Sequence, residues 1–184
     1  IVRGMSRGEH KARERILTDR EIRALWSVTR ESSMGRLVRF ALLTAQRKDK
    51  VAGMRWEDLD GNVWKIRTEE REKGNAGELV LPDLVLEALG TRGSGFVFPT
   101  QQGNKHTAWV HNKKLLDKRS GVTGWRFHDL RRTARSLMAR AGVRPDVAER
   151  VLGHAIQGVE GIYNRHTYTE EKAHALKSLA GLVE

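Results

Sequence analysis

The stretch from Asn62 to Pro82, "NVWKIRTEEREKGNAGELVLP", interrupts a chain whose other patterned segments look helical. Apolar and polar residues alternate at its start, Gly74, Asn75 and Gly77 follow, and the pattern becomes apolar again at 79–81. Such a pattern is typical of a β-hairpin with a polar tip. The sequence therefore predicts an α+β fold, mostly α-helical with one small antiparallel β-sheet.

The first helix signal lies in "LTDREIRALW". Thr18 and Glu21 have the spacing of a capping box, and Leu17 and Ile22 have the spacing of a hydrophobic staple. We therefore expect a helix that begins after Thr18.

Other segments show helical periodicity or a terminator. In "GFVFPT" (95–100) we expect a short edge strand before Pro99. We expect helices in "RLVRFALLTAQR" (36–47), "DKVAGMRWEDL" (49–59), the basic stretch after Gly103, "FHDLRRTARSLMARAG" (127–142), "RPDVAERVLGH" (144–154) and "TEEKAHALKSLAGLVE" (169–184). In the 127–142 helix Leu130, Ala134, Leu137, Met138 and Ala141 share one face, and Gly142 is the expected stop.

The chain has a formal net charge of +11 and a pI of about 10.4. This excess of positive charge indicates a polyanionic partner, and nucleic acid fits best because its phosphates favour Lys and Arg. The alternative is a basic protein whose charge only keeps it soluble.

The composition excludes several other classes. The absence of cysteine excludes disulfides, thiolate metal sites and thiol nucleophiles, and it fits a reducing, cytoplasmic location. No apolar run approaches the roughly 20 residues that span a bilayer, so we expect no membrane partner.

The pentapeptide "HDLRR" places His128 and Arg131 on one face of a predicted helix, with Arg132 adjacent. Together they form a candidate anion site, although a solvated basic face is the alternative. Further residues extend the set to a kit for phosphoryl transfer without a metal or other cofactor: Arg47, Lys73, His154 and Tyr163.

These motifs occur in a familiar order. "TAQRKDK" precedes "MRWEDLD", a lysine lies on the hairpin, "HDLRRTARSLMARAGV" follows, and "LGH" comes nine residues before a tyrosine. The chain resembles the catalytic domain of the tyrosine recombinases, the phage-integrase type, from about Leu17 to its end. The resemblance implies a domain over 17–184 and a basic linker or arm over 1–16, with an N-terminal DNA-binding domain before it.

The resemblance also implies a role for each candidate residue. Arg47 and Arg131 would clamp the scissile phosphate, and His128 would hydrogen-bond it and assist proton transfer. Lys73 would protonate the 5′-oxygen, and His154 would stabilise the transition state. Tyr163 would be the nucleophile that forms a 3′-phosphotyrosyl link, and the cleaved strand would be rejoined without ATP.

The resemblance further implies double-stranded DNA as the partner and a tetramer on paired sites. The C-terminal apolar stripe (Leu176, Leu179, Ala180 and Val183) has two interpretations. It covers its own core, or it is lent to a neighbouring protomer. Type IB topoisomerase-like relaxation is an alternative activity.

Two positions depart from the family pattern. Ala45 stands where the family usually has Gly, and Lys50 stands where it usually has an acid that supports the first arginine. Asp49 is not expected to replace that acid, because adjacent helical residues point about 100° apart. Lys50 is the best argument for a second alternative, a DNA-binding module that has lost catalysis.

Other reactive side chains have simpler interpretations. Tyr168 is expected to pack where the last helix begins, and His106 and His111 are expected to be surface or DNA-backbone residues rather than metal ligands. The five tryptophans are expected mostly in the core, with Trp109 or Trp125 near the site.

Overall fold

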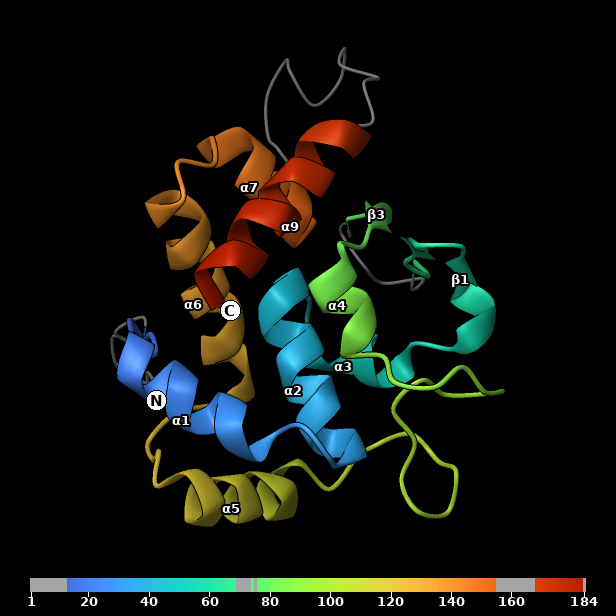
Figure 1. The fold of residues 1–184 in the computed structure, drawn as a ribbon, viewed down its shortest axis with the longest axis vertical. Helices are drawn as coiled ribbons and strands as arrows, with labels where there is room; N and C mark the ends of the chain where they lie inside the picture. Colours follow the sequence, from blue (N-terminus) through green and yellow to red (C-terminus); the bar gives the residue numbers. More distant parts are fainter. Residues whose placement is uncertain (1–12, 69–73, 75, 155–167, 184) are drawn as a thin grey trace, which may run out of the picture.

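The computed structural model describes residues 13–68, 74, 76–154 and 168–183. In this part of the chain none of the helices is long and apolar enough to cross a membrane. The elements are α1 (Asp19–Val28), α2 (Ser33–Thr44), α3 (Lys48–Gly53), a 3₁₀ helix (Trp56–Asp58), β1 (Leu59–Asp60), β2 (Val63–Lys65), β3 (Glu78–Val80), α4 (Asp83–Glu87), α5 (Trp109–Ser120), α6 (Phe127–Arg140), α7 (Pro145–Leu152) and α9 (Thr169–Val183) (Figure 1).

The predicted hairpin is confirmed. β2 and β3 pair antiparallel, with Val63 opposite Val80 and Lys65 opposite Glu78, and β1 adds a third strand on the other side of β2. The fold is mostly helical with this one small sheet, as the sequence predicts.

The expected edge strand at 95–100 is wrong. This segment forms only isolated bridges, between Arg55 and Phe96 and between Pro99 and Lys105. Val97 and Phe98 form a bend between the two bridges, and the bridges have different partners, so the segment forms no continuous ladder. Its apolar residues are used for packing instead, because Val97 and Phe98 are buried.

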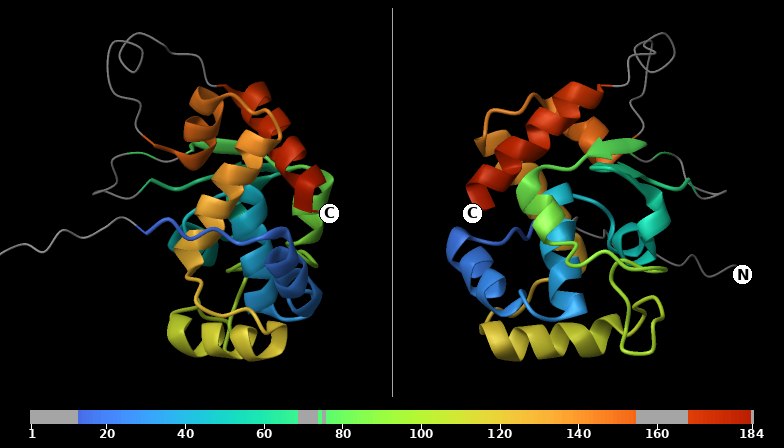
Figure 2. Two further views of the ribbon diagram at one scale, coloured as in Figure 1. Left: turned by 90° about the vertical axis from the view of Figure 1, so that its left-hand side faces the viewer. Right: turned by 45° about the vertical axis from the view of Figure 1, so that its right-hand side comes forward.

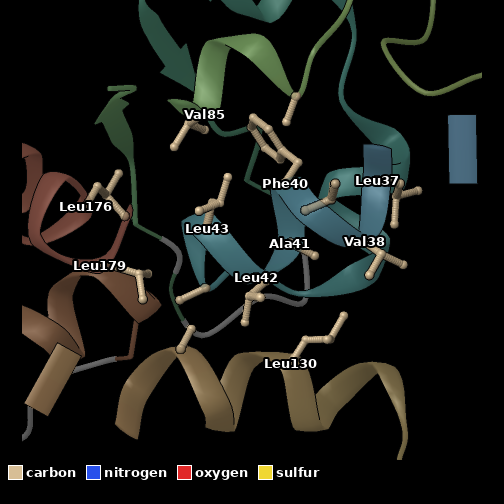
Figure 3. Close-up of a cluster of buried hydrophobic side chains, with 14 of the residues drawn as sticks. Leu37, Val38, Phe40, Ala41, Leu42, Leu43, Val85, Leu130, Leu176 and Leu179 are labelled. Atoms are coloured by element: carbon tan, nitrogen blue, oxygen red, sulfur yellow. The ribbon is translucent and has the colours of Figure 1, made fainter. Parts of the chain in front are cut away.

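Helix α2 lies at the centre of the molecule, between α6 and α9 on one side and α4 on the other (Figures 1 and 3). Leu37, Phe40 and Leu43 of α2 are completely buried. Figure 3 shows Leu130 and Leu176 directed at this helix from α6 and α9. A helix with apolar residues on most sides requires such a buried place.

The start of α1 agrees with the sequence prediction. Glu21 N donates to Thr18 Oγ1 at 3.3 Å and Thr18 N donates to Glu21 Oε2 at 2.8 Å, so the predicted capping box is present. Leu17 and Ile22 are both buried. The helix predicted to run through Arg47, however, ends at Thr44.

The early end of α2 has a backbone cause. Ala45 is left-handed, with φ of 56°, which stops the helix. Arg47 is then extended and becomes the N-cap residue of α3. The first motif arginine therefore lies on a tight connection between two helices and not on a helix.

Helix α9 packs against α2, α6, α7 and β3 of its own chain. Both views in Figure 2 show α9 lying beside α7. The predicted stripe is confirmed, since Leu176, Leu179, Ala180 and Val183 are all buried. The same face buries Lys172, whose Nζ donates to the carbonyl oxygens of Ala76 and Glu78 at 2.8 Å each.

Candidate active site

Arg131 is the centre of the candidate site, although it is only 4% exposed. Its Nη1 donates to Ala45 O at 2.8 Å, and its Nη2 donates to Leu152 O at 2.7 Å. These carbonyls terminate α2 and α7, where helix ends carry partial negative charge. One guanidinium on α6 therefore joins the ends of two other helices.

Arg131 has both a second cation, Arg47, and a carboxylate, Glu149, near it. Burial and the positive charge of Arg47 lower the pKa of Arg131 to about 10, although Glu149 opposes this shift. Arg47 Nη1 lies 3.4 Å from Gly74 O, so this second guanidinium faces the hairpin. Two guanidinium groups close enough to affect each other favour an anion between them.

His128 belongs to the first turn of α6 and is exposed. Partial burial, together with the charges of Arg132, Arg131 and Arg47, lowers the pKa of His128. The imidazole is therefore neutral at neutral pH and able to accept a proton. Sequence reasoning placed His128 and Arg131 together, and the electrostatic interaction between them supports that prediction.

Asp129 stabilises the start of α6, and the sequence analysis did not identify it as a candidate residue. Its carboxylate is completely buried and accepts from Arg126 N and Arg132 Nη1 at 2.8 Å each and from Arg13 Nε at 3.0 Å. Burial would raise the pKa of Asp129, but these hydrogen bonds lower it. An acid in the first turn of a helix is the available sequence signal.

His154 directly follows Gly153, which is left-handed and ends α7. Its Nε2 lies 2.8 Å from Arg131 Nη2, and its Nδ1 lies 2.5 Å from Glu149 Oε2. Arg135 Nε in turn donates to Glu149 Oε1 at 2.8 Å. Sequence reasoning missed Glu149 and Arg135, because their link to His154 needs α6 and α7 to be placed side by side.

The structure therefore brings together Arg47, His128, Arg131 and His154. The other two predicted site residues, Lys73 and Tyr163, lie outside the described residues. Within the described ranges, no group of three His, Cys, Asp or Glu side chains could hold a metal ion.

A sequence profile of the phage integrase family matches residues 15–170. The chain belongs to the phage integrase family. It is 29% identical over 157 residues to the prophage integrase IntA of Escherichia coli K12, covering 80% of this chain and 38% of that protein. It is 27% identical over 139 residues to the integrase of Salmonella phage P22, covering 64% and 35%. The chain thus matches little more than a third of each of these relatives.

Solved structures share the fold. The integrase of mycobacterium phage Brujita superposes with a TM-score of 0.70 at 20% identity, covering 96% of this chain and 66% of that one. The lambda integrase catalytic core gives 0.60 at 17% identity, covering 76% and 94%. The Tn1549 transposon integrase, solved with circular intermediate DNA, gives 0.64 at 20% identity, covering 90% and 65%. The architecture is therefore that of a tyrosine recombinase catalytic domain.

The family's usual glycine at position 45 has a physical explanation in this integrase-family fold. Ala45 is one of two described non-glycine residues with positive φ, and glycine adopts this conformation without strain. Its carbonyl accepts from Arg131, so the turn also orients the buried guanidinium.

Lys50 points toward the end of the sheet, where its Nζ donates to Arg67 O at 2.7 Å. The neighbouring Asp49 is paired with Lys48 at 3.0 Å. The lysine at the family's acid position thus has a structural contact of its own.

Three of the simpler interpretations can be compared with the structure. Tyr168 is buried directly before α9, with the Arg150 guanidinium 3.7 Å from its ring centre, so its packing role is confirmed. The surface prediction is correct for His111 and wrong for His106, which is 7% exposed and lies 3.3 Å from Ser33 Oγ. Burial lowers the pKa of His106.

The tryptophans also follow the prediction in large part. Trp56, Trp64 and Trp125 are buried. Trp109 and Trp125 pack edge-to-face on Phe127, with ring centres 5.0 and 5.4 Å away. Because Phe127 directly precedes His128, these two rings support the start of α6.

Proposed function

We propose that this chain is the catalytic domain of a site-specific DNA recombinase. The observation that supports this most directly is the cluster of Arg131, Arg47, His128 and His154 at the ends of three helices. A phosphate group would fill the anion site between the two guanidinium groups, with the imidazoles of His128 and His154 beside it. The basic charge of the chain suits a DNA partner.

In the proposed reaction Tyr163 gives its phenol proton to the neutral His128 and attacks the scissile phosphorus, so a 3′-phosphotyrosyl bond forms and the bond to the 5′-oxygen breaks. Lys73 gives that oxygen its proton, and Arg47 and Arg131 hold the phosphate oxygens. A 5′-hydroxyl then attacks the phosphotyrosyl link and releases Tyr163. The energy of the broken phosphodiester bond is kept in the phosphotyrosyl link, so rejoining consumes no nucleotide. The proposed reaction uses no metal.

We further propose that four copies assemble on paired DNA sites. One solved relative is described as a lambda integrase dimer bound to a core site. If copies exchange α9, the apolar face that α9 covers in its own chain must receive the partner's α9 in its place. Light scattering with and without duplex DNA tests the assembly.

Covalent capture tests the reaction. The protein is incubated with nicked duplexes in EDTA, quenched with detergent, and compared with Tyr163→Phe and Tyr168→Phe. An adduct that is lost only in Tyr163→Phe is expected. Loss only in Tyr168→Phe would identify the other tyrosine as the nucleophile. Salt-sensitive DNA binding without any adduct would favour the non-catalytic module, and relaxation of supercoils without sequence preference would favour the topoisomerase-like activity.

A further inference from the structure

We infer that Glu149, held by Arg135, is a positioning residue that fixes the tautomer and direction of the His154 ring. The inference rests on the proposed function, which places His154 beside the scissile phosphate. Its evidence is the relay Arg135–Glu149–His154–Arg131, in which each side chain contacts the next.

The two contacts of the ring require one tautomer. A guanidinium only donates, so His154 Nε2, at 2.8 Å from Arg131 Nη2, has its lone pair there. The neutral ring then has its proton on Nδ1. An ionised carboxylate only accepts, and Glu149 Oε2 lies 2.5 Å from that same nitrogen. Both neighbours therefore select the Nδ1–H form.

Glu149 is itself fixed in place. Arg135 Nε donates to its second oxygen at 2.8 Å, so both carboxylate oxygens are engaged. Burial alone would raise the pKa of Glu149, but the hydrogen bonds from Arg135 and His154 lower it, and the carboxylate is ionised at neutral pH. The backbone repeats the connection, because His154 N donates to Glu149 O at 3.0 Å.

This arrangement prepares His154 for a bound phosphate. When a phosphate oxygen takes the Arg131 N–H, the Nε2 lone pair loses its donor. The ring side chain is 46% exposed, and Glu149 still holds its Nδ1 side, so the ring keeps its direction when a phosphate enters.

The direct test is the tautomer, which is read from the ring ¹⁵N shifts of His154, assigned with His154→Asn. The free wild-type protein is expected to show Nδ1–H. Glu149→Gln keeps an acceptor oxygen and should keep the Nδ1–H form alone. In Glu149→Leu only Arg131 still selects that form, so a mixture with the Nε2–H form is expected. Arg135→Met frees Glu149 and should give a mixture. An unchanged tautomer in Glu149→Leu would overturn the inference.

The second test is the single-turnover rate of covalent adduct formation. We expect roughly a tenfold loss in Glu149→Gln and roughly a hundredfold loss in Glu149→Leu, with unchanged DNA affinity, since outer partners of a working histidine have effects of this size. Glu170→Gln is the matched control, because Glu170 is an exposed carboxylate in the first turn of α9. Rates for the Glu149 variants equal to that control would overturn the inference.

The two tests also separate this inference from the proposed function. A wild-type protein with the Glu149-dependent tautomer but without any adduct would overturn the recombinase proposal and leave the assignment of Glu149 standing. A wild-type protein that forms the adduct while its tautomer ignores Glu149 would do the reverse.

Discussion

Arg131 on α6 and Lys172 on α9 are both buried cations, and both donate to backbone carbonyl oxygens. Burial is the main cause that lowers the pKa of each. Each has one cation and one carboxylate nearby, Arg47 and Glu149 for Arg131 and Arg150 and Glu78 for Lys172. Their other contacts differ. Arg131 also contacts the exposed His154 ring, whereas Lys172 donates to two backbone carbonyls.

This difference separates two uses of a costly group. A buried cation stabilises little unless its hydrogen bonds are satisfied. Lys172 donates to the carbonyl oxygens of Ala76 and Glu78 and so connects α9 to β3, which stabilises the fold. Arg131 lies beside a second guanidinium and contacts an exposed imidazole, where a bound anion would be favoured, so we propose that it serves a ligand.

The largest effect is expected from Arg131→Lys. Lysine keeps the charge but cannot reach two carbonyls and a phosphate as a guanidinium fork does. Adduct formation should fall by roughly a hundredfold or more in single-turnover assays. Arg140→Lys, at an exposed ion pair with Asp19, is the control and should react like wild type. Equal rates for the two variants would mean that Arg131 only supports the fold.

Lys172→Met should do the opposite. It leaves the Ala76 and Glu78 carbonyls without this donor, and the free energy of unfolding should fall by about 2 kcal/mol. The folded variant should still form the adduct at a rate close to wild type. Denaturant unfolding measures the loss, with the exposed Lys177→Met as control. A catalytic defect without a stability loss would erase the contrast with Arg131.

The same pair of proteins should respond differently to pH. The pKa of Lys172 is lowered in the folded state, so above that value the folded protein binds fewer protons than the unfolded chain. Stability rises with pH wherever the unfolded state binds more protons. Wild type should therefore gain stability over Lys172→Met as the pH rises from the lowered pKa of Lys172 toward the ordinary lysine value of about 10.4. A gap that narrows with pH would contradict this sign.

The smallest effect is expected at Ala45, whose carbonyl holds Arg131. Ala45→Gly removes the strain of a left-handed alanine and should raise the free energy of unfolding by about 0.5–1 kcal/mol. Ala24→Gly within α1 is the control and should lower it by about 1 kcal/mol. Thermal melts of both variants measure these changes, and a loss at both positions would mean that Ala45 is not strained.

Local features could be predicted from the sequence because neighbouring residues determine them. The capping box of Thr18 and Glu21, the β2–β3 hairpin and the stripe of α9 all depend on short spacings. The end of α2 was predicted too late, because an alanine in a left-handed conformation gives no local signal. The 95–100 strand was wrong because apolar residues there fill the core without pairing.

The candidate site could be predicted only in part. The motifs named Arg47, His128, Arg131 and His154, and the structure gathers these four. The motifs did not show Arg131 donating to Ala45 and Leu152, because this contact joins residues far apart in the sequence. Glu149 and Arg135 were missed because their contact needs α6 and α7 to lie side by side. Asp129 had a local signal, since it is an acid in the first turn of α6.

Arg13 reaches across 116 positions to grip Asp129 at the start of α6, one residue from His128. The stretch before α1 is therefore bonded to α6, the helix that carries His128 and Arg131. Anyone who builds a chimera, joining this unit to a foreign module that reads a different DNA sequence, should place the junction ahead of Arg13. A junction between Arg13 and Leu17 would replace Arg13 with a residue of the foreign module, and Asp129 would lose this hydrogen bond.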